Sequence, residues 1–298
     1  MTIPTQIRAG LLAFLSTTGA AAADGRIAVM SAFEPEWLGL QAALEGAETR
    51  RINGNRFVSG TLEGREVVLM LSGISMVNAA MTTQLALDHF EVEAIVFSGI
   101  AGGVDPSLSV GDVVVPARWG GYLNAILARE TADGFAIPPW MTSDFAPLGM
   151  IHTRTEAVQS ARSEAPEPKF WYEVDADLLA TAEAVAGEVE LPACAGDGAC
   201  LSRPPRIVTG GNGVSGAAFV DNADVRTWAF ETFDAQVLDM ESAAVAQVAY
   251  ANEVPFIAFR SLSDLAGGGP GENEMGTFMA IAADNSAGLV RAFLAALD

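Results

Sequence analysis

Two apolar segments near the C-terminal end of the chain run directly into carboxylates, and they constrain the fold more than any other feature. Residues 237–246 read V-L-D-M-E-S-A-A-V-A, and residues 255–268 read P-F-I-A-F-R-S-L-S-D-L-A-G-G. In an open α/β sheet, ligands bind in the crevice outside the carboxyl ends of the strands. The sequence therefore predicts that Glu241 and Asp264 share one pocket, and a pair of carboxyl groups across a pocket suits cleavage of a glycosidic bond.

Strand-like and helix-like segments alternate along most of the chain, which predicts an α/β fold. Strands are expected at residues 26–31, 57–62, 66–71, 94–98, 112–115, 206–209, 235–238 and 256–261, with 57–71 forming a hairpin around Glu63-Gly64. Helices are expected to begin at Pro35 and to span residues 75–90, 175–189, 222–232, 240–252 and 274–297. The apolar strands indicate a central mixed, largely parallel sheet flanked by helices, a three-layer sandwich.

Residues 119–205 differ from the rest, because they are irregular and rich in Pro, Gly and aromatic side chains. We interpret this tract as a long excursion from the sheet within a single domain that spans residues 24–298.

Half of the residues are hydrophobic, and 16 Lys and Arg face 37 Asp and Glu, for a net charge of −21. So acidic a surface repels phosphate backbones and anionic lipids, which argues against nucleic-acid and membrane partners.

The N-terminus is typical of a secretory signal peptide over residues 1–23. It has one cation (Arg8), a short apolar run and an alanine-rich end before Asp24. The apolar run is too short to span a bilayer. An exported protein is therefore expected, and an N-terminal tail that is disordered or helical is the alternative.

The two cysteines, Cys194 and Cys200, flank A-G-D-G-A in a Pro- and Gly-rich stretch. In an exported chain, this favours a disulfide that closes the loop. Two free thiols in a cytosolic loop are the alternative. A zinc site is not expected, because His89 and His152 lie far away in sequence.

Five motifs in order give the chain a resemblance to the nucleoside phosphorylase/nucleosidase superfamily: S-A-F-E-P-E-W, S-G-I-A-G-G, S-G-A-A-F-V, D-M-E-S-A-A and R-S-L-S-D. Among its members, the chain is most similar to the methylthioadenosine/adenosylhomocysteine nucleosidases. It also resembles the secreted, plant-type branch related to bark storage proteins, through D-P-S-L-S-V-G-D, F-W-Y-E-V-D and S-D-L-A-G-G-G. The resemblance implies a phosphorylase/hydrolase-like fold.

The resemblance implies a role for each acidic residue. Asp264 would be the acid that protonates the purine near N7, since burial raises the pKa of such groups toward the working pH. Glu241, at a helix start that favours an ionised carboxylate, would accept both ribose hydroxyls. Glu36, in the first turn after Pro35, would activate water. The charge of Arg260 in an apolar strand must be paired, either to hold that water with Glu36 and Glu241 or in a purely structural ion pair.

The resemblance also implies the residues that contact the substrate. Met240 would pack against the sugar, and Phe219 would stack on the purine while the backbone at Val220 reads its edge. Ala101 and Gly102 would allow the backbone to approach the ligand closely, and Met275 would border the 5′ substituent. For Phe219 and Met240, a plain core position is the alternative.

The first loop, residues 31–36, carries two carboxylates and no cation, so a phosphate dianion would be repelled there and water is the expected nucleophile. The resemblance, together with this loop, implies a hydrolase of purine nucleosides, with methylthioadenosine or adenosylhomocysteine as the substrate, that needs no metal or organic cofactor. The resemblance implies a homo-oligomer, at least a dimer. A phosphorylase, or a non-catalytic nucleoside-binding or storage protein, is the alternative.

Overall fold

The computed structural model describes residues 25–194, 198, 200–269 and 271–297. The predicted signal peptide, residues 1–23, lies outside this part of the chain. The strands are β1 (Arg26–Ser31), β2 (Glu45–Ile52), β3 (Asn55–Leu62), β4 (Arg65–Leu71), β5 (Val92–Gly103), β6 (Val113–Val115), β7 (Arg118–Gly121), β8 (Ala125–Leu127), β9 (Arg129–Thr131), β10 (Gly134–Ala136), β11 (Ile151–Thr153), β12 (Glu156–Val158), β13 (Glu167–Lys169), β14 (Trp171–Glu173), β15 (Ile207–Thr209), β16 (Asn212–Ser215), β17 (Ala235–Asp239) and β18 (Phe256–Asp264). The helices are α1 (Glu34–Ala43), α2 (Met76–His89), α3 (Ala176–Ala186), α4 (Ala223–Phe233), α5 (Ser242–Asn252) and α6 (Met275–Ala296).

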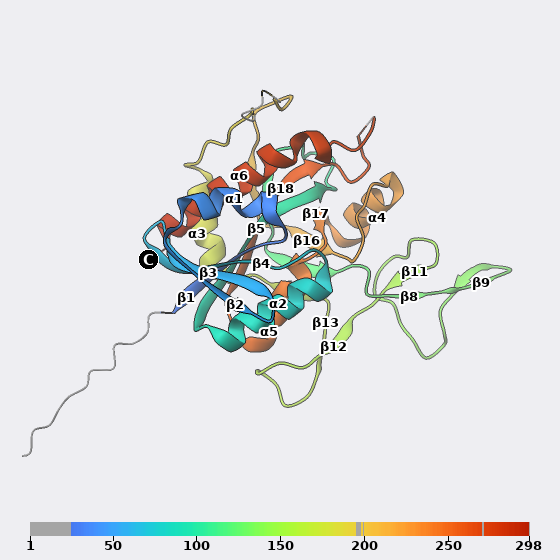
Figure 1. Ribbon diagram of the computed structural model, residues 1–298. Coiled ribbons are helices and arrows are strands. Elements are labelled where there is room, and N and C mark those ends of the chain that lie inside the picture. The colour runs from blue at the N-terminus through green and yellow to red at the C-terminus, as the bar shows by residue number, and fades with distance from the viewer. Residues whose placement is uncertain (1–24, 195–197, 199, 270, 298) are drawn as a thin grey trace, which may run out of the picture.

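One mixed sheet organises the molecule (Figure 1), in the order β14-β7-β16-β17-β5-β1-β4-β3-β2, with β18 pairing to β5 and β6, and β15 to β6. The centre is parallel, since β5 runs alongside both β1 and β18 in the same direction. Antiparallel pairs close one end, where β2, β3 and β4 form consecutive hairpins. The long strand β5 is buried from Ala94 onward, and its carboxyl end carries the glycines that the site requires.

Helices cover both faces of this sheet, so the three-layer α/β sandwich predicted from the sequence is the observed fold (Figure 1). On one face, α1 and α3 pack against α6, and their apolar side chains join those of β1 and β18 in one core. On the other face, α2 packs against α5 over a second core, which contains Met30 and Phe97. Helix α6 is long and apolar enough to cross a membrane, but its inner side is buried against this sheet.

Four strands of the sheet were not predicted: β2, β16 and, in the tract at residues 119–205, β7 and β14. Strand β2 carries no alternating apolar pattern, because seven of its eight residues are exposed and it joins the sheet by backbone pairing to β3. Strand β16 lies in a stretch interpreted from the sequence as a glycine-rich loop. A Cβ on its Gly213 would lie 2.6 Å from the Trp119 ring, so glycine there allows β16 to pack closely against an indole.

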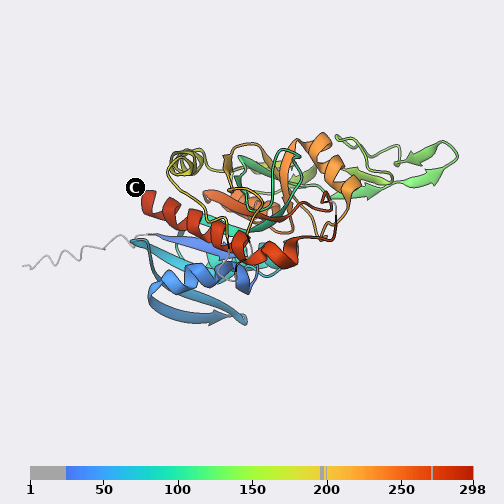
Figure 2. The ribbon, with the colours of Figure 1, turned by 90° about the horizontal axis from the view of Figure 1, so that it is seen from above.

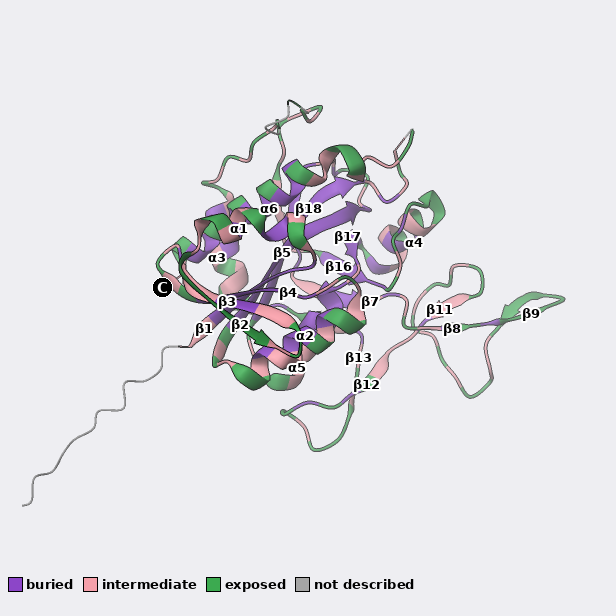
Figure 3. Cartoon of the chain, viewed as in Figure 1, coloured by how far each residue is buried: buried purple, intermediate pink, exposed green. Residues whose placement is uncertain are grey.

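The tract at residues 119–205 is not wholly an excursion from the sheet, which corrects the sequence interpretation. Strands β7 and β14 belong to the main sheet, with β7 parallel to β16 and β14 antiparallel to β7. Between them, the short hairpins β8–β11 and β9–β10 form an arm that projects from the body in both views (Figures 1 and 2). Exposed residues concentrate on this arm, as Figure 3 shows. In a second loop, Cys194 and Cys200 form a disulfide.

Candidate functional site

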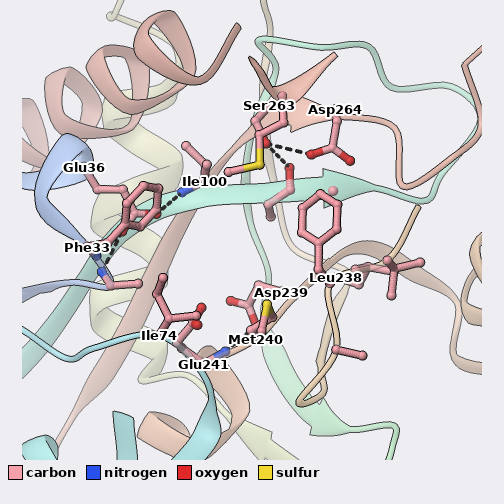
Figure 4. A pocket seen from close by; sticks show the side chains of 17 residues that line it. Phe33, Glu36, Ile74, Ile100, Leu238, Asp239, Met240, Glu241, Ser263 and Asp264 are labelled. Atoms are coloured by element: carbon pink, nitrogen blue, oxygen red, sulfur yellow. Dashed lines mark hydrogen bonds between the residues drawn. The ribbon is translucent and has the colours of Figure 1, made fainter. Parts of the chain in front are cut away.

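The carboxyl ends of β5, β17 and β18 meet the turn before α1 around a cavity of about 330 Å³. Figure 4 shows Glu36 on one side of this cavity, Asp264 on the opposite side, and Glu241 with Asp239 along a third. The lining residues are Ala32, Phe33, Glu36, Ile74, Ile100, Ala101, Gly102, Ala218, Phe219, Val220, Leu238, Asp239, Met240, Glu241, Ser263, Asp264 and Met275. Four carboxyl groups therefore face a pocket that is otherwise mainly apolar.

The carboxylate of Glu36 is buried and held by backbone N–H groups. Oε2 accepts from Ala32 (2.6 Å) and Phe33 (3.3 Å), and Oε1 accepts from Ile100 on β5 (2.9 Å). Burial raises the pKa of Glu36, while the nearby charge of Arg260 and these three N–H donors act in the opposite direction. Oε1 accepts only this one hydrogen bond among the described residues, so it retains a lone pair for a ligand or water.

Glu241 lies at the start of α5, where Oε1 accepts the backbone N–H of Ser75 at 2.7 Å. Ser75 holds a positive φ of 79°, an unfavourable conformation for a residue with a side chain. Burial, followed by the negative charge of Asp239, raises the pKa of Glu241 to about 7. The helix-start argument for a firmly ionised Glu241 is therefore outweighed by burial.

Asp264 ends β18 and has donors on both oxygens. Oδ1 accepts from the N–H of Ala266 (2.8 Å) and the amide of Asn273 (3.4 Å), and Oδ2 accepts from the hydroxyl of Ser263 (2.8 Å). Burial raises the pKa of Asp264; the three donors oppose this rise, and the charge of Glu274 adds to it. A buried carboxyl group with a raised pKa is suited to donate a proton.

Arg260 lies beneath the pocket and does not line it. Its Nε is 2.8 Å from Asp239 Oδ2, and Nε and Nη2 both donate to the Ser242 hydroxyl. The guanidinium stacks 4.0 Å from the ring centroid of Phe97. The partner that pairs its charge is thus Asp239, rather than Glu36 or Glu241.

The remaining nitrogen of Arg260, Nη1, has no hydrogen-bond partner among the described residues. A Cβ on Gly99 would lie 1.9 Å from this atom and 2.8 Å from Glu36 Oε1. Only glycine at that position therefore leaves room for the guanidinium to approach the base of the pocket.

Every other residue predicted to contact a ligand lines this cavity: Ala101, Gly102, Phe219, Val220, Met240 and Met275. Phe219 is 57% exposed, so it is not a core residue and its ring is free to cover a ligand. Among the described residues, no group of three or more His, Cys, Asp or Glu side chains is arranged to hold a metal ion.

Sequence reasoning missed Asp239, although the signal was present. Asp239 is the last residue of β17, so the rule that identified Asp264 at the end of β18 applies to it equally. Its carboxylate also accepts hydrogen bonds from the hydroxyls of Ser215 and Ser242. The residue is a shared anchor for Arg260 and for the start of α5.

Comparison with known proteins identifies the family of the chain. The family model for the phosphorylase superfamily matches residues 26–295. A 5′-methylthioadenosine/S-adenosylhomocysteine nucleosidase from Bacillus thuringiensis (strain Al Hakam) is 33% identical over 244 residues, which cover 81% of this chain and 87% of the relative.

Solved structures of such nucleosidases are similar in fold. The Neisseria meningitidis protein in complex with methylthio-immucillin-A has a TM-score of 0.68 and 25% identity, covering 92% of this chain and 100% of its own. The Colwellia psychrerythraea 34H protein in complex with adenine has a TM-score of 0.67 and 29% identity, covering 92% of this chain and 96% of its own.

Proposed function

The chain belongs to the phosphorylase superfamily, and we propose that it is a nucleosidase that hydrolyses the N-glycosidic bond of 5′-thio-substituted adenosines and releases adenine. The curated relatives that match it are named for 5′-methylthioadenosine and S-adenosylhomocysteine, and these names support the substrate class that we propose. The observation that carries it is the placement of Asp264 and Glu36 on opposite sides of one pocket, with Glu241 between them.

Departure of the purine requires a proton, because the base leaves with the electron pair of the glycosidic bond. Asp264 is the group suited to supply it, since burial raises its pKa and so favours the protonated form. The leaving adenine then carries the proton at its imidazole nitrogen, and Asp264 is left ionised with three donors around it.

Glu241 is the group suited to the sugar. Ser75 occupies one position on Oε1 and leaves Oε2 and the other lone pairs for ribose hydroxyls. A sugar that develops positive charge at C1′ is stabilised by nearby carboxylates, and Asp239, Glu241 and Glu36 surround this part of the pocket.

Water is the nucleophile that the charges favour. The described lining residues include no Arg, Lys or His, so a phosphate dianion would face the carboxyl groups of Glu36, Glu241 and Asp264 with no cation in the pocket wall. The guanidinium of Arg56, on β3, is stacked 4.6 Å from the ring centroid of Trp37. Glu36 would take a proton from the water through the free lone pair of Oε1.

The 5′ end of the pocket is suited to an apolar thioether group. The walls there are apolar: Phe33 and Met275 pack against Ile100 in one cluster, and Ile74 also lines the cavity. A charged 5′-phosphate would lose its hydration there without gaining a partner.

A second copy of the chain would complete this end of the pocket. Ile74, just before α2, and Val77 and Met81 on α2 recur at helical spacing as an exposed apolar face, with exposed fractions of 50%, 80% and 47%. Ile74 both belongs to this apolar face and lines the pocket, so burying the face in a homodimer would also shield the 5′ group from water.

We also propose that the protein is exported. This proposal rests on the N-terminal sequence, and the Cys194–Cys200 disulfide supports it. Mass spectrometry of protein purified from its native cells tests it. A mature chain that begins near Asp24 with both cysteines oxidised is expected, and an intact Met1 with two free thiols would overturn it.

Adenine release from methylthioadenosine, adenosylhomocysteine, adenosine, inosine and adenosine 5′-monophosphate tests the activity, with each assay run with and without phosphate. We expect the two thio-substituted substrates to be fastest and phosphate to have no effect. Strictly phosphate-dependent release would identify a phosphorylase. Tight nucleoside binding without release in any condition would identify a binding or storage protein.

A further inference from the structure

The residue Asn273, immediately before α6, links three parts of the site through one side-chain amide. Its Nδ2 donates to Asp264 Oδ1 (3.4 Å) and to Asp221 Oδ1 (3.1 Å). Its Oδ1 accepts the backbone N–H of Met275, which lines the pocket (2.9 Å). The end of β18, the segment before α4 and the start of α6 are therefore joined at this amide.

The loop that carries Asn273 is fixed at its base. Ala266 accepts a backbone hydrogen bond from Asn222 (3.1 Å), and Gly267, at a φ of +86°, lies so close to the same segment that a Cβ would be 2.3 Å from the Asn222 nitrogen. Ser263 and Ala266 hold Asp264 from within its own segment. Asn273 is the donor that holds it from outside.

The two oxygens of Asp264 are not equivalent. Oδ1 accepts from two nitrogen donors, Ala266 and Asn273, so it cannot also carry the acid proton without losing one of them. Within the described part of the chain, the Ser263 hydroxyl is the one hydrogen-bond partner of Oδ2, and it can reverse its direction because the Ala101 carbonyl lies 3.5 Å away as an alternative acceptor. The proton of the neutral acid therefore belongs on Oδ2.

We propose that Asn273 is a positioning residue that holds Oδ1 of Asp264 as an acceptor and so keeps the transferable proton on Oδ2. This inference rests on the proposed role of Asp264 as the acid. Asn273 itself exchanges no proton with the substrate; it acts through Asp264.

The charged groups near Asp264 come from several elements, and nearly all are negative. The negative groups are Glu274 before α6, Asp221 before α4, Glu36 on α1, Asp239 at the end of β17 and Glu241 at the start of α5. The one cation in this set is Arg226 on α4, which donates to the Gly103 carbonyl. The amide of Asn273 is a neutral donor between the carboxylates of Asp221 and Asp264. Its N–H favours the ionised form of Asp264, so its removal raises the pKa of Asp264.

Three substitutions separate this role from helix capping. Asn273→Ser keeps an oxygen for the Met275 N–H but lacks the Nδ2 donor. Asn273→Ala loses both functions. Asn273→Asp keeps the oxygen and places a negative charge beside Asp264. Asn252→Ala is the matched control, because Asn252 makes its side-chain hydrogen bonds to Gln84 and Val248 on a remote part of the surface.

The pH profile of kcat/KM for adenine release is the decisive readout. The alkaline limb reports the loss of the Asp264 proton, and we expect it to move up by about 0.5–1 pH unit in both Asn273→Ser and Asn273→Ala. Asn273→Asp should move it further in the same direction. In all three, kcat should fall about tenfold, and only Asn273→Ala should also lose thermal stability.

An unmoved limb in all three variants, with a lower Tm in Asn273→Ala alone, would reduce Asn273 to a helix cap and overturn the proposal. Titration of the Asp264 carboxyl carbon by NMR, assigned with Asp264→Asn, gives the same answer without turnover. If the wild type releases no adenine, the proposed function fails, while the NMR titration still decides whether Asn273 acts on Asp264.

Discussion

The Arg260 guanidinium lies 2.8 Å from the Asp239 carboxylate at a point where the two side chains are 0% and 2% exposed. Ser242 completes the contact, because its hydroxyl donates to Asp239 and accepts from two nitrogens of Arg260. Of the four carboxyl groups at the pocket, Asp239 is thus neutralised by Arg260. Glu36, Glu241 and Asp264 make no direct ion pair with any residue that the structure describes.

Removal of one partner from this pair should destabilise the fold strongly. Arg260→Met leaves Asp239 buried without its countercharge, and the free energy of unfolding should fall by about 3–5 kcal/mol. Urea denaturation followed by circular dichroism measures it. Arg291→Met is the matched control, since the Arg291–Glu63 pair is 47% and 27% exposed, and a loss of less than about 1 kcal/mol is expected there. Equal losses in the two variants would contradict the structure.

The burial of Glu241 predicts a pH-dependent stability. Its pKa rises from 4.5 to about 7 on folding, so its contribution to stability is fully present below pH 4.5 and is lost as the pH rises through 7. Glu241→Gln removes this loss while an oxygen remains for the Ser75 N–H. The difference in free energy of unfolding between the variant and the wild type should be larger at pH 8 than at pH 5, by up to about 3 kcal/mol in favour of the variant. Thermal denaturation at the two pH values measures the gain, and a constant difference would refute it.

Asp264→Asn should abolish turnover without abolishing binding. The carboxamide has no proton of the required acidity, so kcat should fall by about 10²–10⁴-fold. Adenine binding, measured by calorimetry, should change much less. Asp234→Asn is the control, because Asp234 is exposed in a left-handed conformation that asparagine readily adopts. Full activity of Asp264→Asn would remove Asp264 from the mechanism.

The fold was predictable where side chains face a core and unpredictable where only the backbone pairs. Strands β1, β5 and β18 have continuous apolar runs because helices cover both of their faces. Strand β2, an exposed edge, has no such requirement on its side chains. Strands β7 and β14 are too short, at four and three residues, to show a strand pattern within the Pro- and Gly-rich sequence around them.

The site was predictable as a set of residues but not in its pairing or charge. A carboxylate at a strand end is visible in sequence, whereas burial and neighbouring charges, which govern its ionisation, are not. Glu241 illustrates this, since its place at a helix start favoured an ionised group while the fold raises its pKa. The pairing of Arg260 with Asp239 depends on side-chain direction at the end of β17, which no motif specifies.

The exposed apolar face formed by Ile74, Val77 and Met81 predicts self-association. Val77→Asp places a charge on the most exposed of these three residues, and the native mass should fall from that of a dimer to that of a monomer. Analytical ultracentrifugation measures this. Ala180→Asp on the exposed side of α3 is the control and should leave the mass unchanged. A wild-type protein that is monomeric at high concentration would contradict the prediction.

The source of the oxygen on the released sugar tests the central claim most directly. Turnover of methylthioadenosine in ¹⁸O-labelled water, with phosphate present, should yield methylthioribose that carries one ¹⁸O at C1, because water oriented by Glu36 attacks there. A sugar 1-phosphate without the label would contradict hydrolysis and identify phosphate as the nucleophile.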